Sequence, residues 1–148
     1  MDLLPLPGKN DKMKNVLMKS VFYLIMICFL HANAQGQEQN RWIAPSEADT
    51  LTNPYSLEDS EIISKGMDLY MMVCATCHGE RGDGAGGAGQ SFNPPPADFT
   101  SDLIQEQSDG ALFWKLSEGN PPGMLSYKNI LSEEERWMIV TYLRRFTE

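Results

Sequence analysis

The sequence has little of several residue types that mark common classes of function. Of its 148 residues only 3 are cysteine and 2 are histidine, and 12 basic residues face 20 acidic ones. The resulting net charge of −8 argues against nucleic acid and against an anionic membrane surface as partners, because both require a basic patch. The longest apolar run covers the ten residues from Val21 to Leu30, too short for the about 20 residues of a membrane-spanning helix.

The first 34 residues contain the three parts of a secretory signal. Lysines precede the apolar run, and Ala32-Asn33-Ala34 after it places small residues at the two positions that signal peptidase reads. The sequence therefore predicts export, cleavage after Ala34 and a periplasmic mature protein without a membrane span. Met13 could begin a shorter signal, which would leave residues 1–12 upstream of it. An uncleaved membrane anchor is the alternative.

Removal of the signal (residues 1–34) simplifies the chemistry of the chain. Cys28 and His31 leave with it, so the mature chain keeps two cysteines, Cys74 and Cys77, and one histidine, His78. Subtracting the segment's four lysines and two aspartates from the totals changes the net charge from −8 to −10. The chemically reactive side chains of the mature chain therefore lie within five consecutive residues.

The remaining residues predict an all-α domain with long loops rich in glycine and proline. Residues 35–58 are polar and irregular, which indicates an N-terminal extension, and the domain itself is predicted to span 59–148. Apolar residues recur at helical spacing over about 57–73 and 109–117 and again after Ser132. So few aliphatic residues make a thin core, which a large apolar prosthetic group would complete. We therefore expect three to four helices packed round such a group.

The motif Cys74-Ala-Thr-Cys77-His78 matches C-x-x-C-H, the attachment signature of c-type haem. Two thiols three positions apart on a helical turn can each add to one vinyl group of the porphyrin and form two thioethers. The imidazole of the adjacent histidine can then bind the iron from the same side. One haem c, attached through Cys74 and Cys77 after export, is the predicted cofactor.

Three other roles for these residues fit less well. A thioredoxin-type redox pair belongs in a βαβ context and does not need the following histidine. A structural zinc site needs four ligands, and Cys74, Cys77 and His78 exhaust the cysteines and histidines of the mature chain. A disulfide of such short span would stabilise the fold little.

The iron needs a sixth ligand, or it keeps an open site. The mature chain contains five methionines: Met67, Met71, Met72, Met124 and Met138. Four of them lie on predicted helices, where methionine more often fills a core than binds a metal. Met124 lies in an irregular loop 46 residues after His78 and could reach the opposite face of the haem, so the sequence favours it. A thioether opposite histidine raises the reduction potential, as electron-transfer cytochromes require.

One glycine pattern resembles a nucleotide-binding motif. Gly82-x-Gly84-x-x-Gly87 matches G-x-G-x-x-G, but it follows the haem motif instead of a strand, and prolines 94–96 stand where a helix should run. We interpret this stretch as a flexible loop at the haem edge. Acidic residues are scattered singly, so the sequence assigns no carboxylate pair to acid–base catalysis.

Residues 60–148 resemble a class I c-type cytochrome, the soluble mono-haem kind found in bacterial periplasms. The resemblance rests on Gly66-x-x-x-Tyr70, Cys74–Gly79, Gly123-Met124 and Leu131–Arg144. It implies the cytochrome c fold, in which the first and last helices cross near a right angle, with Gly66 and Tyr70 against Trp137 and Tyr142.

The resemblance also implies how the histidine ligand is held. The backbone carbonyl of a loop proline, one of Pro94, Pro95 and Pro96, would accept a hydrogen bond from the imidazole and fix its ring. Leu125 stands where the family often has a proline after the methionine ligand. From their size and position, we expect six side chains to bury the haem: Tyr70, Phe92, Phe99, Leu112, Trp114 and Tyr127.

These features predict an electron carrier and not an enzyme. The iron would alternate between Fe(II) and Fe(III) and pass single electrons between respiratory partners, whose docking surfaces should be basic because this chain is acidic. The chain would act as a monomer or as a complex subunit. A haem-bearing subunit of a larger membrane-bound complex, docked through residues 35–58, is one alternative. A peroxidase-like enzyme with an open sixth site is another, and Met124 argues against it.

Overall fold

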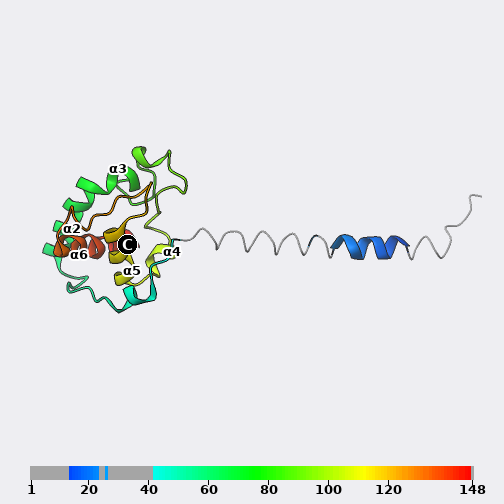
Figure 1. Cartoon of the computed structure of the whole chain (residues 1–148), viewed down its shortest axis with the longest axis horizontal. Coiled ribbons are helices and arrows are strands. Elements are labelled where there is room, and N and C mark those ends of the chain that lie inside the picture. The colour runs from blue at the N-terminus through cyan, green and yellow to red at the C-terminus, as the bar shows by residue number, and fades with distance from the viewer. Residues whose placement is uncertain (1–13, 24–25, 27–41, 148) are drawn as a thin grey trace, which may run out of the picture. The chain divides into compact units, whose positions relative to one another are not determined.

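A computed structural model describes residues 14–23, 26 and 42–147 of the chain. The chain divides into two compact units, Met1–Trp42 and Ile43–Glu148, and Figure 1 shows the order of the elements. Within the described residues, no helix combines the length and the apolar character that crossing a membrane requires.

The described part of the first unit is a helix over residues 14–23. Its apolar side chains are exposed, among them Phe22 at 64% and Tyr23 at 67%. The predicted cleavage site after Ala34 lies outside the described residues, as does Cys28, so cleavage stays a prediction.

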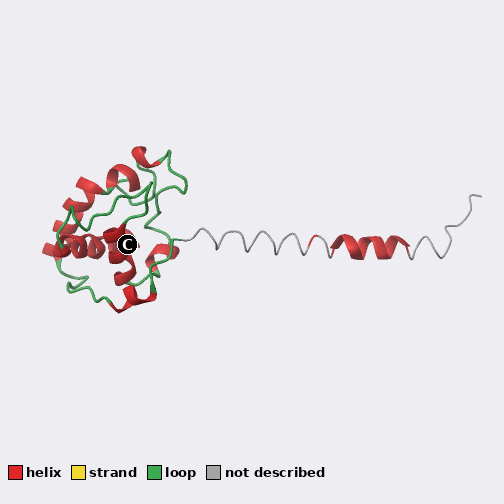
Figure 2. Cartoon of the chain, viewed as in Figure 1, coloured by secondary structure: helices red, strands yellow, loops and turns green. Residues whose placement is uncertain are grey.

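The second unit is helical and confirms the predicted all-α class. Its elements are η1 (Ser46–Thr50), α2 (Ser60–Val73), α3 (Ala75–His78), η2 (Gly87–Gly89), α4 (Asp102–Gln105), α5 (Asp109–Glu118), α6 (Glu133–Leu143) and η3 (Arg144–Thr147), where η marks a 3₁₀ helix. Figure 2 shows helices joined by long loops and no strand among the described residues. One isolated β-bridge pairs Asn120 with Met124. The three longest helices are the three that the sequence predicts, and the two shorter ones flank the glycine-rich loop.

Polar side chains cap the three longest helices at their first turn. The carboxylate of Asp59 accepts two backbone N–H bonds at the start of α2, and the hydroxyl of Ser108 accepts one at the start of α5. At α6, Ser132 and Glu135 form a reciprocal capping box. Because the first four N–H groups of a helix lack partners within it, these residues determine where each helix begins.

Helices α2 and α6 approach each other closely at Gly66. A β-carbon added there would lie 2.2 Å from the carbonyl oxygen of Met138 and 3.0 Å from the β-carbon of Tyr142, so only glycine permits this approach. One turn later, Tyr70 is fully buried, and its ring centroid lies 5.4 Å from that of Tyr142. The predicted contact between Tyr142 and these two residues of α2 is confirmed.

The core consists of two apolar clusters, and the prediction for Trp137 is wrong. The haem-motif cluster contains Tyr70, Cys74, Ala75, Leu116, Ile139 and Leu143. The second cluster contains Leu112, Phe113, Trp137 and Val140. Trp137 stacks on Phe113 with ring centroids 4.0 Å apart and does not meet Gly66. Five residues separate positions 137 and 142, or about 140° round a helix, so the two side chains face different neighbours.

The segment before α2, predicted as an extension, packs on the domain where the structure describes it. A β-carbon added at Gly110 of α5 would collide with the carbonyl oxygen of Ala48 in η1, which is itself buried. Asn53 donates hydrogen bonds to the carboxylate of Asp109 at 2.8 Å and to the hydroxyl of Thr141 at 3.1 Å. The segment therefore joins α5 to α6 on the side of the second cluster.

Candidate haem site

The C-x-x-C-H motif lies where α2 ends and α3 begins. Cys74 separates the two helices, and its N–H donates to the carbonyl of Tyr70 at 2.8 Å. The N–H groups of Cys77 and His78 both donate to the carbonyl of Cys74, at 3.1 and 2.9 Å. This winding places the two thiols and the imidazole on one turn, as the sequence predicts.

The two thiols are free and differ in burial. Cys74 is 8% exposed and Cys77 is half-buried. Burial, with a smaller contribution from Cys77, raises the pKa of Cys74 to about 12. An apolar environment thus favours the neutral thiol of Cys74 over its thiolate. Among residues 14–23, 26 and 42–147, no group of three or more His, Cys, Asp or Glu side chains is arranged to hold a metal ion.

His78 is held by a hydrogen bond and by a ring contact. Its Nδ1 lies 3.1 Å from the carbonyl oxygen of Ala97; because a carbonyl only accepts, Nδ1 carries the hydrogen and Nε2 keeps its lone pair. The imidazole stacks on Phe99 with centroids 4.5 Å apart and planes 21° apart. Burial lowers the pKa of His78, although the Ala97 carbonyl partly opposes this. The ring is therefore neutral and oriented, with one nitrogen able to bind iron.

The carbonyl that accepts the hydrogen bond from the imidazole of His78 belongs to Ala97. The prediction that one of the prolines at 94–96 provides this carbonyl is wrong. Residues 95–98 belong to no regular helix or turn. The carbonyl of Pro96 faces the loop at Gly84, where an added β-carbon would lie 2.8 Å from it. Only the next carbonyl is directed at the imidazole.

The glycine-rich loop lies against the backbone of the haem motif. A β-carbon at Gly86 would lie 2.4 Å from the carbonyl carbon of Cys77, and one at Gly89 would lie 2.7 Å from its oxygen. The N–H of Gly84 donates to the carbonyl of His78 at 2.8 Å. Close packing on α3 therefore accounts for Gly86 and Gly89, in agreement with a loop beside the motif.

Tyr70 ties α2 to the end of the motif. Its hydroxyl donates to the carbonyl of Gly79 at 2.6 Å, and Gly79 has a φ of +81°, a conformation that favours glycine. The rings of Phe99 and Phe146 lie 6.1 and 5.1 Å from that of Tyr70. These contacts surround the turn that carries His78 with aromatic side chains.

Met124 packs against the haem-motif cluster. Met124 lies at the end of a tight turn. Its N–H donates to the carbonyl of Asn120 at 3.1 Å, and the N–H of Asn120 donates to the carbonyl of Met124 at 2.9 Å. The three methionines of α2 are exposed: Met67 and Met71 at 41% and Met72 at 68%. Of these four, only Met124 packs against the cluster that contains Cys74.

Half of the side chains that we expected to bury the haem lie in this cluster. Tyr70 belongs to it, and Phe99 and Tyr127 pack against it. Leu112 belongs to the second cluster, Trp114 lines a separate pocket, and Phe92 is 38% exposed. The prediction missed Leu116, Ile139, Leu143 and Phe146. The four-residue spacing of Ile139 and Leu143 on one helix face could have indicated two of them.

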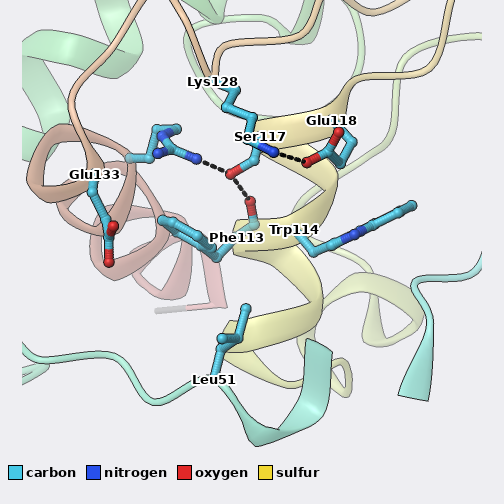
Figure 3. Close-up of a pocket in the computed structure, with 8 residues that line it drawn as sticks. Leu51, Phe113, Trp114, Ser117, Glu118, Lys128 and Glu133 are labelled. Atoms are coloured by element: carbon cyan, nitrogen blue, oxygen red, sulfur yellow. Dashed lines mark hydrogen bonds and ion pairs between the residues drawn. The ribbon is translucent and has the colours of Figure 1, made fainter. Parts of the chain in front are cut away.

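A separate pocket of about 240 Å³ lies between α5 and α6 (Figure 3). The buried guanidinium of Arg136 donates to the hydroxyl of Ser117, which donates to the carbonyl of Phe113 at 2.8 Å. The guanidinium also lies 4.7 Å from the ring centroid of Phe113. At the rim, Lys128 pairs with Glu118 at 3.1 Å. The four residues predicted to attach the haem or bind its iron, Cys74, Cys77, His78 and Met124, do not line this pocket.

The residues of the motif and the Met124 loop fit a covalently attached haem. Two free thiols and a neutral imidazole share one turn, and a thioether packs against the same apolar cluster. The surrounding side chains are aromatic and aliphatic, as burial of a porphyrin requires.

Comparisons with known proteins agree with this fit. The sequence model of a family described as cytochrome C oxidase, cbb3-type, subunit III matches residues 61–143. Among solved structures, a chain of the Kuenenia stuttgartiensis reducing HAO-like protein complex is similar, with a TM-score of 0.51 and 28% sequence identity. The similarity covers 65% of this chain and 45% of that chain, so this chain spans less than half of that length. A search of curated proteins gave no significant match.

Proposed function

Because this chain belongs to the cbb3-type cytochrome c oxidase subunit III family of c-type cytochromes, we propose that it carries single electrons between respiratory redox partners, as an exported mono-haem protein. A cytochrome c domain of this family binds haem c covalently, and its function is haem electron transfer. The number of haems, the ligands, the location and the free-carrier role are parts of the proposal.

In this proposal, Cys74 and Cys77 would hold the haem, and His78 and Met124 would bind its iron. The bound haem supplies a one-electron Fe(II)/Fe(III) couple. The observation that carries the assignment is the hydrogen bond from Nδ1 of His78 to Ala97, since it leaves Nε2 as the free ligand atom. The proximity of Met124 to the cluster around Cys74 supports Met124 as the second residue that would bind the iron.

The residues around the haem motif hold the His78 ligand in one orientation and keep water out of the site during electron transfer. The Ala97 carbonyl and the Phe99 ring hold the imidazole in one orientation, which also tunes the basicity of the ligand. Tyr70, Leu116 and the other members of the haem-motif cluster exclude water. An apolar environment of this kind favours the less charged ferrous state and so raises the reduction potential.

A redox titration with optical spectra tests this function. We expect one haem per chain, a single one-electron transition and a ferric spectrum with a methionine–iron charge-transfer band near the red end. Two transitions would contradict the mono-haem assignment. A high-spin ferric spectrum that lacks the band would favour an open sixth site.

Export is supported by the signal pattern of residues 1–34 and by the chemistry of haem c, which is attached after export. We expect the mature protein, expressed in a bacterium that assembles c-type cytochromes, to be recovered from the periplasm with Gln35 as its first residue. Sequencing of the N-terminus measures this directly. A chain that retains residues 13–34 and sediments with membranes would instead indicate an uncleaved anchor.

A haem-bearing subunit of a larger complex is the second candidate. The family's description names an oxidase subunit, and the similar Kuenenia stuttgartiensis chain belongs to a protein complex. Gel filtration of material from the native source distinguishes the two. Elution at the size of one chain supports the free carrier, and elution with a larger assembly supports the subunit.

A further inference from the structure

We propose that Tyr127 is a positioning residue that holds the Met124 loop (residues 119–131) closed against the haem motif. The inference rests on the proposed function, in which Met124 binds the iron. The side chain of Tyr127 makes no hydrogen bond to His78 or to Met124.

Tyr127 hydrogen-bonds a backbone carbonyl at the end of α2. Its hydroxyl donates to the carbonyl of Val73 at 2.9 Å, and Val73 is the last residue of α2, directly before Cys74. In a continuous helix this carbonyl would accept from the N–H of Cys77. That N–H donates to the carbonyl of Cys74 instead, so the break at the haem motif frees an acceptor and Tyr127 occupies it.

The backbone around Tyr127 is hydrogen-bonded to α5 on the opposite side. Its N–H donates to the carbonyl of Leu116 at 3.2 Å, and the N–H of Lys128 donates to that of Ser117 at 3.2 Å. The hydroxyl of Ser126 also donates to the Ser117 carbonyl, at 2.6 Å. These bonds use the last carbonyls of α5, which lack partners within the helix.

The anchor on α5 is itself held in place. The guanidinium of Arg136 in α6 donates to the hydroxyl of Ser117, and Figure 3 shows Ser117 next to Phe113, whose carbonyl accepts from that hydroxyl. Lys128 adds an ion pair to Glu118 at 3.1 Å. The C-terminal end of α5 is therefore held in place, and Tyr127 connects it to α2.

The bond between Tyr127 and Val73 has no substitute. Within the described residues, the Tyr127–Val73 bond is the one hydrogen bond that joins residues 119–131 to α2 or α3. Met124 lies three residues before Tyr127, and both pack against the cluster that contains Cys74. Movement of the loop as a unit away from the motif therefore breaks this bond.

The test compares ferric Tyr127→Phe holoprotein with the wild type and with Tyr55→Phe. Tyr55 packs against the second cluster, so its variant also loses a tyrosine hydroxyl but leaves the loop intact. As the pH rises, hydroxide and lysine amines compete with the thioether for the iron, and the methionine–iron band disappears. Added imidazole competes in the same way at constant pH.

We expect Tyr127→Phe to open the loop about three- to tenfold more readily, the effect of losing one hydrogen bond. The pH midpoint of band loss should then fall by about 0.5–1 unit, since one pH unit corresponds to a tenfold change. Imidazole should bind about three- to tenfold more tightly. Tyr55→Phe should match the wild type in both measurements. Ser126→Ala, which removes a bond on the α5 side, should shift both in the same direction as Tyr127→Phe.

The outcomes separate this inference from the proposed function. A wild-type protein without the band refutes methionine ligation itself. A wild-type band combined with unchanged midpoints in Tyr127→Phe and Ser126→Ala overturns the positioning role. A lower melting temperature of Tyr127→Phe with an unchanged midpoint and imidazole affinity also overturns it, because the hydroxyl would then stabilise the fold alone.

Discussion

The tautomer and orientation of the His78 imidazole depend on neighbouring groups that do not themselves bind the iron. The Ala97 carbonyl selects its tautomer, and the Phe99 ring covers one face. Both belong to the segment that follows the glycine-rich loop. At the scale of single residues, the site is therefore determined as much by the neighbours of the C-x-x-C-H motif as by the motif.

Replacement of Met124 by alanine tests the sixth ligand. We expect the holoprotein to retain covalent haem, because Cys74 and Cys77 are untouched, but to lose the methionine–iron charge-transfer band. Its reduction potential should fall, since a thioether stabilises the ferrous state relative to water or hydroxide. Optical spectra and a redox titration measure both effects.

Met72→Ala is the matched control for this prediction. Met72 is 68% exposed on α2, so its removal should leave the band and the potential as in the wild type. An Met124→Ala protein with an unchanged band would refute the ligand assignment.

At the scale of elements, the approach of α2 to α6 depends on Gly66. The Gly66→Ala substitution should gain about 1 kcal/mol of helix propensity but place a methyl group 2.2 Å from a backbone oxygen of Met138. Overpacking costs about 1–3 kcal/mol, and the upper end applies because backbone cannot move aside easily. We expect a net loss of about 2 kcal/mol in the free energy of unfolding, measured by denaturant titration.

Gly87→Ala is the control for this substitution. Nothing lies within 4 Å of a β-carbon at Gly87, so its stability should stay within about 0.5 kcal/mol of the wild type. Equal stability of the two variants would mean that the helices separate at no cost, and the close approach would then not matter for the fold.

A second link between elements joins Arg144, after α6, to the start of α5. Its guanidinium donates to the carboxylate of Asp109 at 2.8 and 2.5 Å, and it also bonds the carbonyls of Gln105 and Gln107. Asp109→Asn leaves this half-buried cation without its counter-charge. We expect a loss of about 2 kcal/mol, between the values for exposed and fully buried pairs.

The exposed pair of Glu61 and Lys65 provides the comparison. These side chains are 77% and 52% exposed, so Glu61→Gln should cost at most about 0.5 kcal/mol. Thermal or denaturant unfolding of both variants measures the difference. A cost for Asp109→Asn no larger than that for Glu61→Gln would contradict a structural role for the Arg144 network.

At the scale of the whole molecule, the acidic charge should direct association. Residues 35–148 carry a net charge of −10 after the four lysines and two aspartates of the first 34 residues are subtracted. A partner with a basic docking surface would be steered by this field, and salt screens such steering. We expect the second-order rate constant of electron transfer with a native partner to fall steadily as ionic strength rises.

Stopped-flow measurements between low and physiological salt test this expectation. A small uncharged reductant provides the control, because its rate should change little with salt. A protein-partner rate that rises with ionic strength would indicate an acidic docking surface on the partner instead.

Local sequence determined much of this protein. The caps at Asp59, Ser108 and Ser132 set the starts of the long helices, and the C-x-x-C-H spacing placed two thiols and an imidazole on one turn, because both depend on neighbours within four residues. The loop position of Met124 could also be inferred from composition. These features need no knowledge of the rest of the chain.

Tertiary structure decided which distant groups meet. Ala97 rather than a proline bonds His78, and Trp137 stacks on Phe113 rather than on α2. The hydroxyl of Tyr127 donates to the carbonyl of Val73, 54 residues earlier in the chain, which the break at the haem motif leaves without a partner in the helix. Such contacts depend on the direction of one carbonyl or one helix face, and that direction is set only when the separate elements pack together.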